Sequence, residues 1–232
     1  MANAQFLKRI AAGRTDLVLD FVGVGGSACA VDANNSALVQ WCAYYGDVSA
    51  VRFLVAHGES LHRLGADLGL NAAAFHGHWQ LCQFLLENAA PVDGVNSSSG
   101  ETPLHSALCS EDRIRHDAVL RVLLAAGANA SAVTVPGVET GAFMRDCRTK
   151  GETPLHRAAA FGTTETIQIL LDAGASCDAK DANGDTPLAW ASWYRRPTGI
   201  LRVLCYGDFG IHPQYQDLRA SLVGEPSLGD AR

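Results

Sequence analysis

The stretch GETPLHRAAAFGTTETIQILLDAGA, residues 151–175, decides the fold. Thr153 can cap a helix through its hydroxyl. Pro154 suits the first helical position, because the N–H that proline lacks would be unpaired there. Gly162 is expected to end this helix, and either of the two threonines after it can begin another. The sequence therefore predicts two short helices joined by a tight turn.

The second of these helices is amphipathic. Ile167, Leu170 and Leu171 are spaced at i, i+3 and i+4, so they lie on one face, and Gly174 is the expected stop. Helices this short cannot bury an apolar face against each other alone. They need copies of the same unit as neighbours.

Such copies are present along the chain. Residues 100–105 repeat GETPLH letter for letter, and residues 184–188 read GDTPL. The positions equivalent to Thr153 are Ala4, Ala37, Leu68, Thr102, Thr153 itself and Thr186. Neighbouring positions are 31 to 34 residues apart, except that 51 residues separate the fourth from the fifth. The end of the second helix recurs in the same register, at Gly25, Gly58, Ala89, Gly127, Gly174 and Gly207.

A period near 33 with TPLH and a later LLxxGA resembles the ankyrin repeat family, over roughly residues 2–210. The resemblance implies an all-α solenoid of about six helix-turn-helix repeats, with hairpin-like loops projecting from the stack. It also implies a protein that binds other proteins.

The expected layout is one ankyrin-repeat domain over residues 1–223, followed by a flexible tail, 224–232. The expected repeats are about 2–31, 32–63, 64–96, 97–147, 148–180 and 181–212, with a capping helix at 213–223. In the second loop Asn35 stands where the sixth has Gly184, as expected where φ is positive.

The fourth repeat contains extra residues in two places. Four lie within residues 110–116, between its helices, and about fourteen lie within residues 132–148, before the fifth repeat. The longer insertion alternates β-branched residues around Pro136-Gly137, which predicts a hairpin there. A loop this long is typical of a functional segment, although a tolerated surface insertion is the alternative.

Composition excludes several classes of protein. The 232 residues are 48% hydrophobic with a net charge of −6, so neither disorder nor a nucleic-acid or membrane partner is favoured. Seven scattered cysteines without a CxxC pair fit reduced thiols in the cytoplasm, with the nucleus as an alternative. No stretch has the roughly 20 apolar residues that span a bilayer. We expect a protein that is monomeric alone.

The family resemblance also implies where a partner binds. The two residues before each inter-helix glycine face the concave side, and the inserted loop lies beside them. The candidate partner-binding residues are Tyr44, Tyr45, Phe75, His76, Phe161, Trp193 and Tyr194 in the repeats, with Val135, Phe143, Met144 and Arg145 in the insertion. Large, partly exposed rings are typical of interface hot spots. The alternative is that these rings pack on neighbouring repeats.

No residue pattern predicts catalysis, a cofactor or a metal. His105 and His156 lie in TPLH, where the family implies hydrogen bonds between adjacent loops. His76 and His78 are not expected to face each other across Gly77, and no further ligand completes a set. We therefore expect a non-catalytic adaptor, scaffold or inhibitor. A regulatory or targeting subunit of a larger complex stays open, as does an enzyme or metal protein that uses the insertion.

Overall fold

The computed structural model describes residues 2–109, 113–140 and 147–205. These residues form twelve α-helices and one 3-10 helix. The first helices of successive pairs are α1 (Ala2–Ala11), α3 (Leu38–Tyr44), α5 (Leu70–Phe75), α7 (Pro103–Ala107), α9 (Pro154–Phe161) and α11 (Pro187–Trp193). The second helices are α2 (Leu17–Gly23), α4 (Val48–Ala56), α6 (Trp79–Glu87), α8 (Arg113–Ala125), α10 (Thr164–Asp172) and α12 (Thr198–Leu204), and the 3-10 helix is η1 (Leu61–Leu64).

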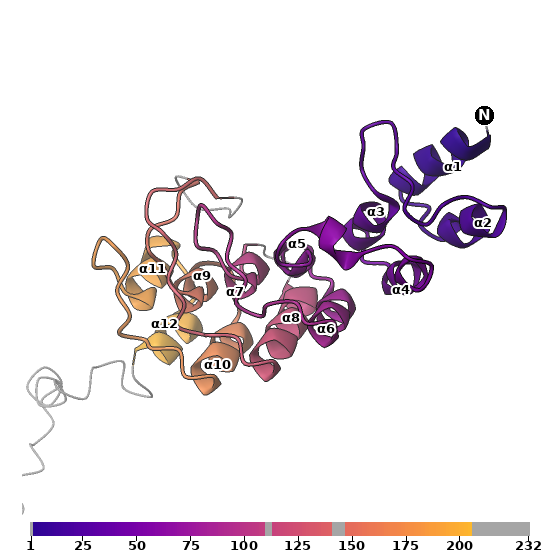
Figure 1. Ribbon diagram of the computed structural model, residues 1–232. Helices are drawn as coiled ribbons and strands as arrows, with labels where there is room; N and C mark the ends of the chain where they lie inside the picture. The colour runs from indigo at the N-terminus through magenta and orange to yellow at the C-terminus, as the bar shows by residue number, and fades with distance from the viewer. Residues whose placement is uncertain (1, 110–112, 141–146, 206–232) are drawn as a thin grey trace, which may run out of the picture.

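The helix pairs stack side by side into an elongated solenoid. In Figure 1 the odd-numbered helices form an upper row and the even-numbered helices a lower row, with long loops projecting above the upper row. Each helix packs on its partner and on the next pair, as α9 does on α10 and α11. The predicted all-α solenoid is confirmed.

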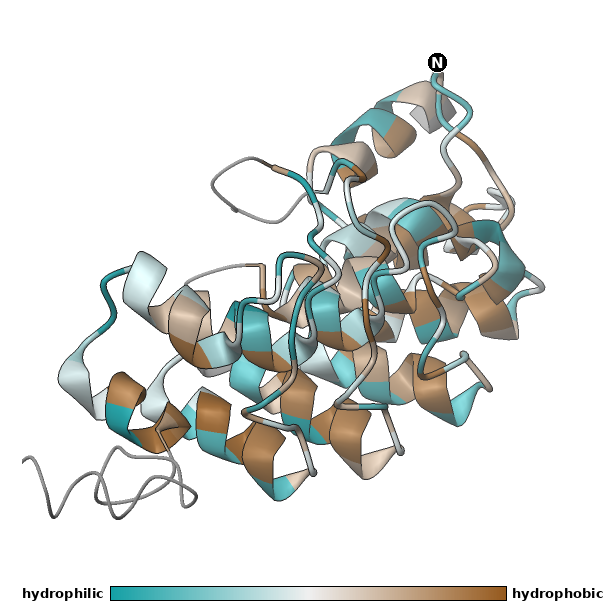
Figure 2. Cartoon of the chain, turned by 90° about the vertical axis from the view of Figure 1, so that its left-hand side faces the viewer, coloured by the Kyte–Doolittle hydropathy of each residue, from teal (hydrophilic) through white to brown (hydrophobic). Residues whose placement is uncertain are grey.

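The core lies between the two rows. The position after the Thr-Pro pair, or its equivalent, is occupied in consecutive pairs by Val39, Leu70, Leu104 and Leu155, which are all fully buried. Figure 2 shows hydrophobic and hydrophilic residues on the same helices, as expected for amphipathic helices. Burying one such leucine contributes about 1.5–3 kcal/mol, and each pair obtains this only with its neighbours in place.

Two loops are built around an aspartate that binds a tryptophan nine residues later. Asp181 accepts two loop N–H groups at 2.9 Å through Oδ1 and the indole N–H of Trp190 at 3.1 Å through Oδ2. Asp32 binds the indole of Trp41 at 3.0 Å in the same way. The predicted positive φ at Asn35 is confirmed, at 62°. These bonds fix the loop to the first helix of its pair.

The TPLH histidines join adjacent loops. The backbone N–H of Thr153 donates to Nδ1 of His156 at 3.1 Å, so Nε2 carries the proton and donates to the carbonyl of Asp185 at 3.0 Å. His105 does the same towards the carbonyl of Glu152, at 3.2 Å. The expected structural role of both histidines is confirmed. Thr153 is the N-cap residue of α9, as expected, and its hydroxyl lies 2.9 Å from the same ring nitrogen.

The α8–α9 loop, residues 126–153, is hydrogen-bonded differently from the expected hairpin. The N–H of Gly137 donates to the carbonyl of Thr149 at 2.7 Å, and that of Thr140 to the carbonyl of Cys147 at 3.0 Å. The two limbs of the loop therefore pair over residues 137–140 and 147–149. Pro136 and Gly137 form a turn, with φ of 84° at Gly137, but the expectation of a hairpin around them is wrong, because these residues lie at the base of the paired segment.

Several predictions from the sequence fall partly or wholly outside the described residues. Of the extra residues placed at 110–116, those from Arg113 onward are helical and lengthen α8 to 13 residues. Residues 110–112 lie outside the described part of the chain. So do Phe143, Met144 and Arg145, the capping helix expected at 213–223 and the tail.

Gly46→Ala is expected to destabilise the protein more than Gly58→Ala. Both glycines have positive φ, 73° and 95°, but a Cβ at Gly46 would lie 2.5 Å from the His78 ring, whereas nothing lies within 4 Å at Gly58. The ring cannot easily move, since its Nε2 is 2.9 Å from the carbonyl oxygen of Tyr44. We expect about 1 kcal/mol for Gly58→Ala and about 3 kcal/mol for Gly46→Ala in urea unfolding. Equal losses would contradict the close packing at Gly46.

Candidate functional site

The positions before the inter-helix turns carry exposed aromatic rings at two ends of the solenoid. Tyr44, at the end of α3, is 52% exposed, and Trp193, at the end of α11, is 62% exposed. Phe161 is only 8% exposed, because its ring packs against Tyr194 with centroids 5.2 Å apart. The expected row of exposed rings is therefore interrupted at α9, and the partner-binding role of Phe161 stays a prediction.

Near the N-terminal end the rings form the Tyr44 cluster, which comprises Tyr44, Tyr45, Phe75, His76 and His78. The Tyr44 ring meets Tyr45 and His76 edge to face, with centroids 5.1 and 4.9 Å apart. His76 and His78 stack at 5.7 Å, so the expectation that these rings do not face each other is wrong. The intervening Gly77 has φ of 74°, which turns the chain back on itself.

Burial and hydrogen bonding act on different members of the Tyr44 cluster. Burial lowers the pKa of His76, and the charges of His78 and His116 lower it further. Tyr45 donates its hydroxyl to the carbonyl of Ala11 at 3.0 Å, so this ring also packs on the preceding helix pair. Tyr44 is therefore the ring of the cluster most available to a partner.

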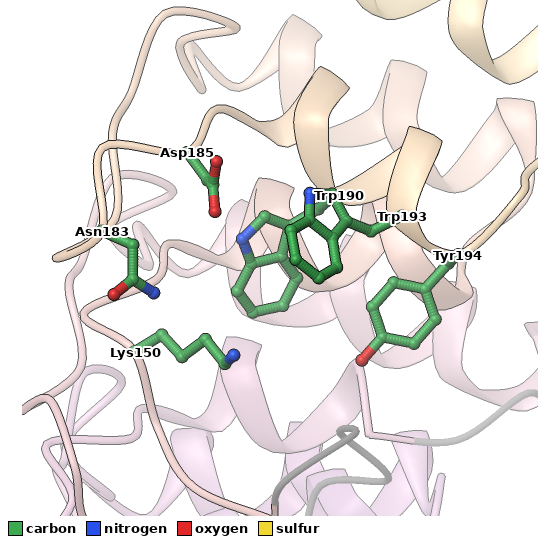
Figure 3. Close-up of a pocket in the computed structure, with 6 residues that line it drawn as sticks. All are labelled: Lys150, Asn183, Asp185, Trp190, Trp193 and Tyr194. Carbon is green, nitrogen blue, oxygen red and sulfur yellow. The ribbon is translucent and has the colours of Figure 1, made fainter.

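At the other end, three aromatic rings and three polar residues line a pocket of about 290 Å³, which we call the Trp193 pocket. Its lining residues are Lys150, Asn183, Asp185, Trp190, Trp193 and Tyr194. Figure 3 shows the polar residues on the loops, with the rings of α11 and of Tyr194, which follows it, beside them. Trp190 is held from behind by Asp181 and by an edge contact with His156 at 5.4 Å. The Trp190 ring is thus fixed before any ligand binds.

The sequence predicted Trp193 and Tyr194 as partner-binding residues but not the three polar residues of the pocket. Lys150 lies just before the GETPLH motif, and Asn183 and Asp185 flank the glycine of GDTPL. Residues just ahead of each TPL motif occupy loop tips, so this shared register could have indicated them. What brings the loops together is a backbone bond from Ala182 N–H to the Lys150 carbonyl at 2.8 Å.

A buried charge cluster lies beneath the α8–α9 loop and was not predicted. Arg157 is fully buried, and its Nη2 lies 2.7 Å from a Glu101 oxygen and 2.6 Å from a Glu152 oxygen. Its Nη1 also donates to the carbonyl of His105 at 3.1 Å and contacts the Cys109 sulfur at 3.1 Å. The guanidinium therefore joins α7, α9 and both GETPLH loops.

The same carboxylates hold the α8–α9 loop. Thr134 donates its hydroxyl to Glu152 at 2.7 Å, and Thr140 donates to Glu101. Backbone bonds add to this, since the Thr134 N–H donates to the Glu152 carbonyl at 3.1 Å and the Val135 N–H to the Ser99 carbonyl at 2.8 Å. The described limbs of the loop are therefore fixed to the solenoid at several points.

The charge cluster is ionised. Burial raises the pKa of Glu101 and Glu152, but the Arg157 charge and the hydrogen bonds outweigh it, so both pKa values lie below their usual range. Burial lowers the pKa of His105 to about 3, with the Arg157 charge acting in the same direction. Burial also raises the pKa of the Cys109 thiol to about 11, so this thiol stays protonated and is a poor nucleophile.

On the outside of the α8–α9 loop, Val133 and Val135 are exposed while Thr134 between them is buried. This alternation places the two valines on the outer surface of the loop. Val135 is one of the residues predicted to bind a partner. In the described ranges no group of three histidine, cysteine or acidic side chains could hold a metal ion. Nor is any helix there long and apolar enough to cross a bilayer.

The stacked helix pairs and their projecting loops define a helical-repeat solenoid. The ankyrin-repeat family profile (three copies) matches residues 39–134 and 136–217, so this chain belongs to the ankyrin repeat family. The dominant use of such repeats is to bind other proteins, and a protein–protein interaction module is what this family membership supports.

Curated relatives match the chain to different extents. It is 27% identical over 225 residues to palmitoyltransferase ZDHHC13 of Mus musculus, covering 82% of this chain and 34% of that protein. It is 28% identical over 150 residues to human ankyrin repeat domain-containing protein 37, covering 62% of this chain and 84% of that protein. Human Rabankyrin-5 is 41% identical over 66 residues, which are 28% of this chain and 6% of that protein.

Proposed function

We propose that this protein is a non-catalytic docking module whose concave side binds a partner protein. The partner contacts the Tyr44 cluster, the Trp193 pocket and the outer face of the α8–α9 loop. The observation that carries the proposal is the exposure of Tyr44 and Trp193 at equivalent helix ends. Large rings that stay partly exposed on a rigid scaffold are the side chains most enriched among interface hot spots.

Pre-organisation supports this proposal. Binding is weakened by the entropy of ordering loops and side chains at the interface. Here the loops are already held, by the aspartate–tryptophan pairs and by the Arg157 cluster, so little of that entropy remains to be lost. In this proposal the solenoid is a single domain in the cytoplasm, with the nucleus as the second location.

A second candidate is a recruiting subunit or segment of a larger assembly. The chain spans about a third of the length of palmitoyltransferase ZDHHC13, so in that relative the matching region adjoins much further sequence. By analogy, this protein would present a target to an activity that resides elsewhere. Mass measurement of the native assembly distinguishes this candidate from a free adaptor.

Tyr44→Ala combined with Trp193→Ala is expected to weaken partner binding by at least about 30-fold, because two hot-spot rings are removed. The partner is first identified by cross-linking to the wild-type chain, and its dissociation constant is then measured for each variant. Trp79→Ala is the matched control, since Trp79 is an exposed tryptophan at the start of α6. Unchanged affinity in a folded double variant would contradict the proposed surface.

A further inference from the structure

The Trp193 pocket has a composition that selects among ligands. Lys150 comes from the loop before α9, and Asn183 and Asp185 come from the loop before α11. In Figure 3 Asp185 lies above and Lys150 below, with the indole rings of Trp190 and Trp193 beside the space between them. The pocket therefore has a carboxylate, an ammonium group and an aromatic wall.

The size of the pocket limits its occupant. Sites for cofactors and drug-sized ligands have volumes of about 300–1,000 Å³. At about 290 Å³ the Trp193 pocket lies at the lower limit of that range, and it suits one large side chain with its backbone. This is the size expected for the anchor residue of a bound polypeptide.

The charges of Lys150 and Asp185 then limit which kind of side chain the pocket can bind. A carboxylate in the pocket would be attracted by Lys150 but repelled by Asp185, and a lysine or arginine would be attracted by Asp185 but repelled by Lys150, so a charged side chain suits only one of the two groups. An aliphatic side chain would displace water from both charged groups without offering a hydrogen bond, which is unfavourable. A primary amide satisfies both sides, because its carbonyl accepts from an ammonium group and its NH₂ donates to a carboxylate.

The remaining lining residues fit an amide as well. The side chain of Asn183 can donate to and accept from another amide. The planar amide can lie flat against the exposed Trp193 indole, which is 62% exposed and so leaves its face open. Trp190 already donates its N–H to Asp181, so it contributes only its ring.

We propose that the Trp193 pocket binds the side-chain amide of a glutamine or asparagine in the partner polypeptide. This inference rests on the proposed docking function and names the chemistry of one part of its surface. The amide carbonyl faces Lys150, the NH₂ group faces Asp185, and the amide plane stacks on the indoles.

The test uses the full chain and four capped peptides of sequence Gly-Ser-Xaa-Ser-Gly, in which Xaa is glutamine, glutamate, lysine or leucine. The chain has four tryptophans, so the indole N–H resonances report on the pocket directly. Trp190 and Trp193 line it, whereas Trp41 and Trp79 lie elsewhere and serve as internal controls. Dissociation constants come from the saturation of the resonance shifts.

We expect saturable shifts at Trp190 and Trp193 with the glutamine peptide, and binding about three- to tenfold weaker for the other three, since each places a like charge or an apolar group against Lys150 or Asp185. Lys150→Met should allow the lysine peptide to bind better while weakening the glutamine peptide. Tighter binding of glutamate, lysine or leucine by the wild-type chain would overturn the proposal, as would no saturable shift with glutamine.

The peptide experiment and the partner-binding experiment can fail independently of each other. If the cross-linked partner loses affinity in the Tyr44 and Trp193 double variant but the glutamine peptide does not bind, only the amide chemistry is wrong. If the glutamine peptide binds but the partner keeps its affinity for the double variant, the pocket is a site and the proposed docking surface is wrong.

Discussion

Arg157→Ala is expected to lower the free energy of unfolding by about 3–5 kcal/mol, because it leaves two buried carboxylates without their counter-charge. Glu152 is fully buried, and Glu101 nearly so. The substitution also removes the donors to the His105 carbonyl and the Cys109 sulfur. The measurement is urea unfolding of both chains at neutral pH.

Arg121→Ala is the matched control. Arg121 lies 2.6 Å from Glu165, the same distance as Arg157 from Glu152, but both partners of this pair are more than half exposed. Exposed pairs contribute about 0–1 kcal/mol, since water screens them. Similar losses for the two variants would show that burial does not set the value of the Arg157 cluster.

The same substitution should also loosen the α8–α9 loop. Thr134 and Thr140 donate to the two carboxylates that Arg157 holds in place. We expect faster amide hydrogen exchange at Gly137 and Thr149, whose N–H groups close the paired limbs, than in the Arg121→Ala control. Unchanged protection there would mean that the backbone bonds alone hold the loop.

Stability is expected to fall between pH 6.5 and pH 5 because of buried, neutral histidines. The pKa of His105 is lowered from 6.5 to about 3, so between these pH values the histidine is protonated in the unfolded chain but neutral in the folded chain. The stabilisation is complete above pH 6.5 and is lost as the pH falls. His105 alone contributes a loss of about 1–2 kcal/mol over this interval, and the lowered pKa of His156 acts in the same direction.

The check is urea unfolding at pH 7.5 and pH 5 for the wild type and His105→Gln. Glutamine can still accept from the Thr102 N–H but does not titrate, so the difference between the two pH values should shrink by about 1–2 kcal/mol. His57→Gln, a change at an exposed histidine, is the control and should leave the difference unchanged. An undiminished difference in His105→Gln would show that this ring is not kept neutral.

Below pH 5 a second loss is expected from the Arg157 cluster. The pKa values of Glu101 and Glu152 are lowered in the folded chain, so their stabilisation is present above the ordinary glutamate pKa and disappears as the pH falls through the lowered values. This loss should be absent when both carboxylates are replaced by glutamine.

The sequence by itself determined the fold of this protein. The recurring TPL motifs with a glycine 21 or 25 residues later define the helix pairs, because capping, the proline position and the glycine stop all act within a few residues. The same local reasoning gave the positive φ at Asn35. The family resemblance gave the bonding of His105 and His156. It also placed Tyr44 and Trp193 at exposed helix ends.

Only the tertiary structure decided how distant segments meet. Phe161, one position after the equivalent of Trp193, is buried, since Tyr194 of the next helix pair covers it. The repeat pattern predicted no role for Arg157, yet two glutamates 51 residues apart meet on it. The pairing in the α8–α9 loop and the polar side of the Trp193 pocket have the same origin. Such contacts depend on which loops lie side by side, and a local pattern of residues contains no information about that.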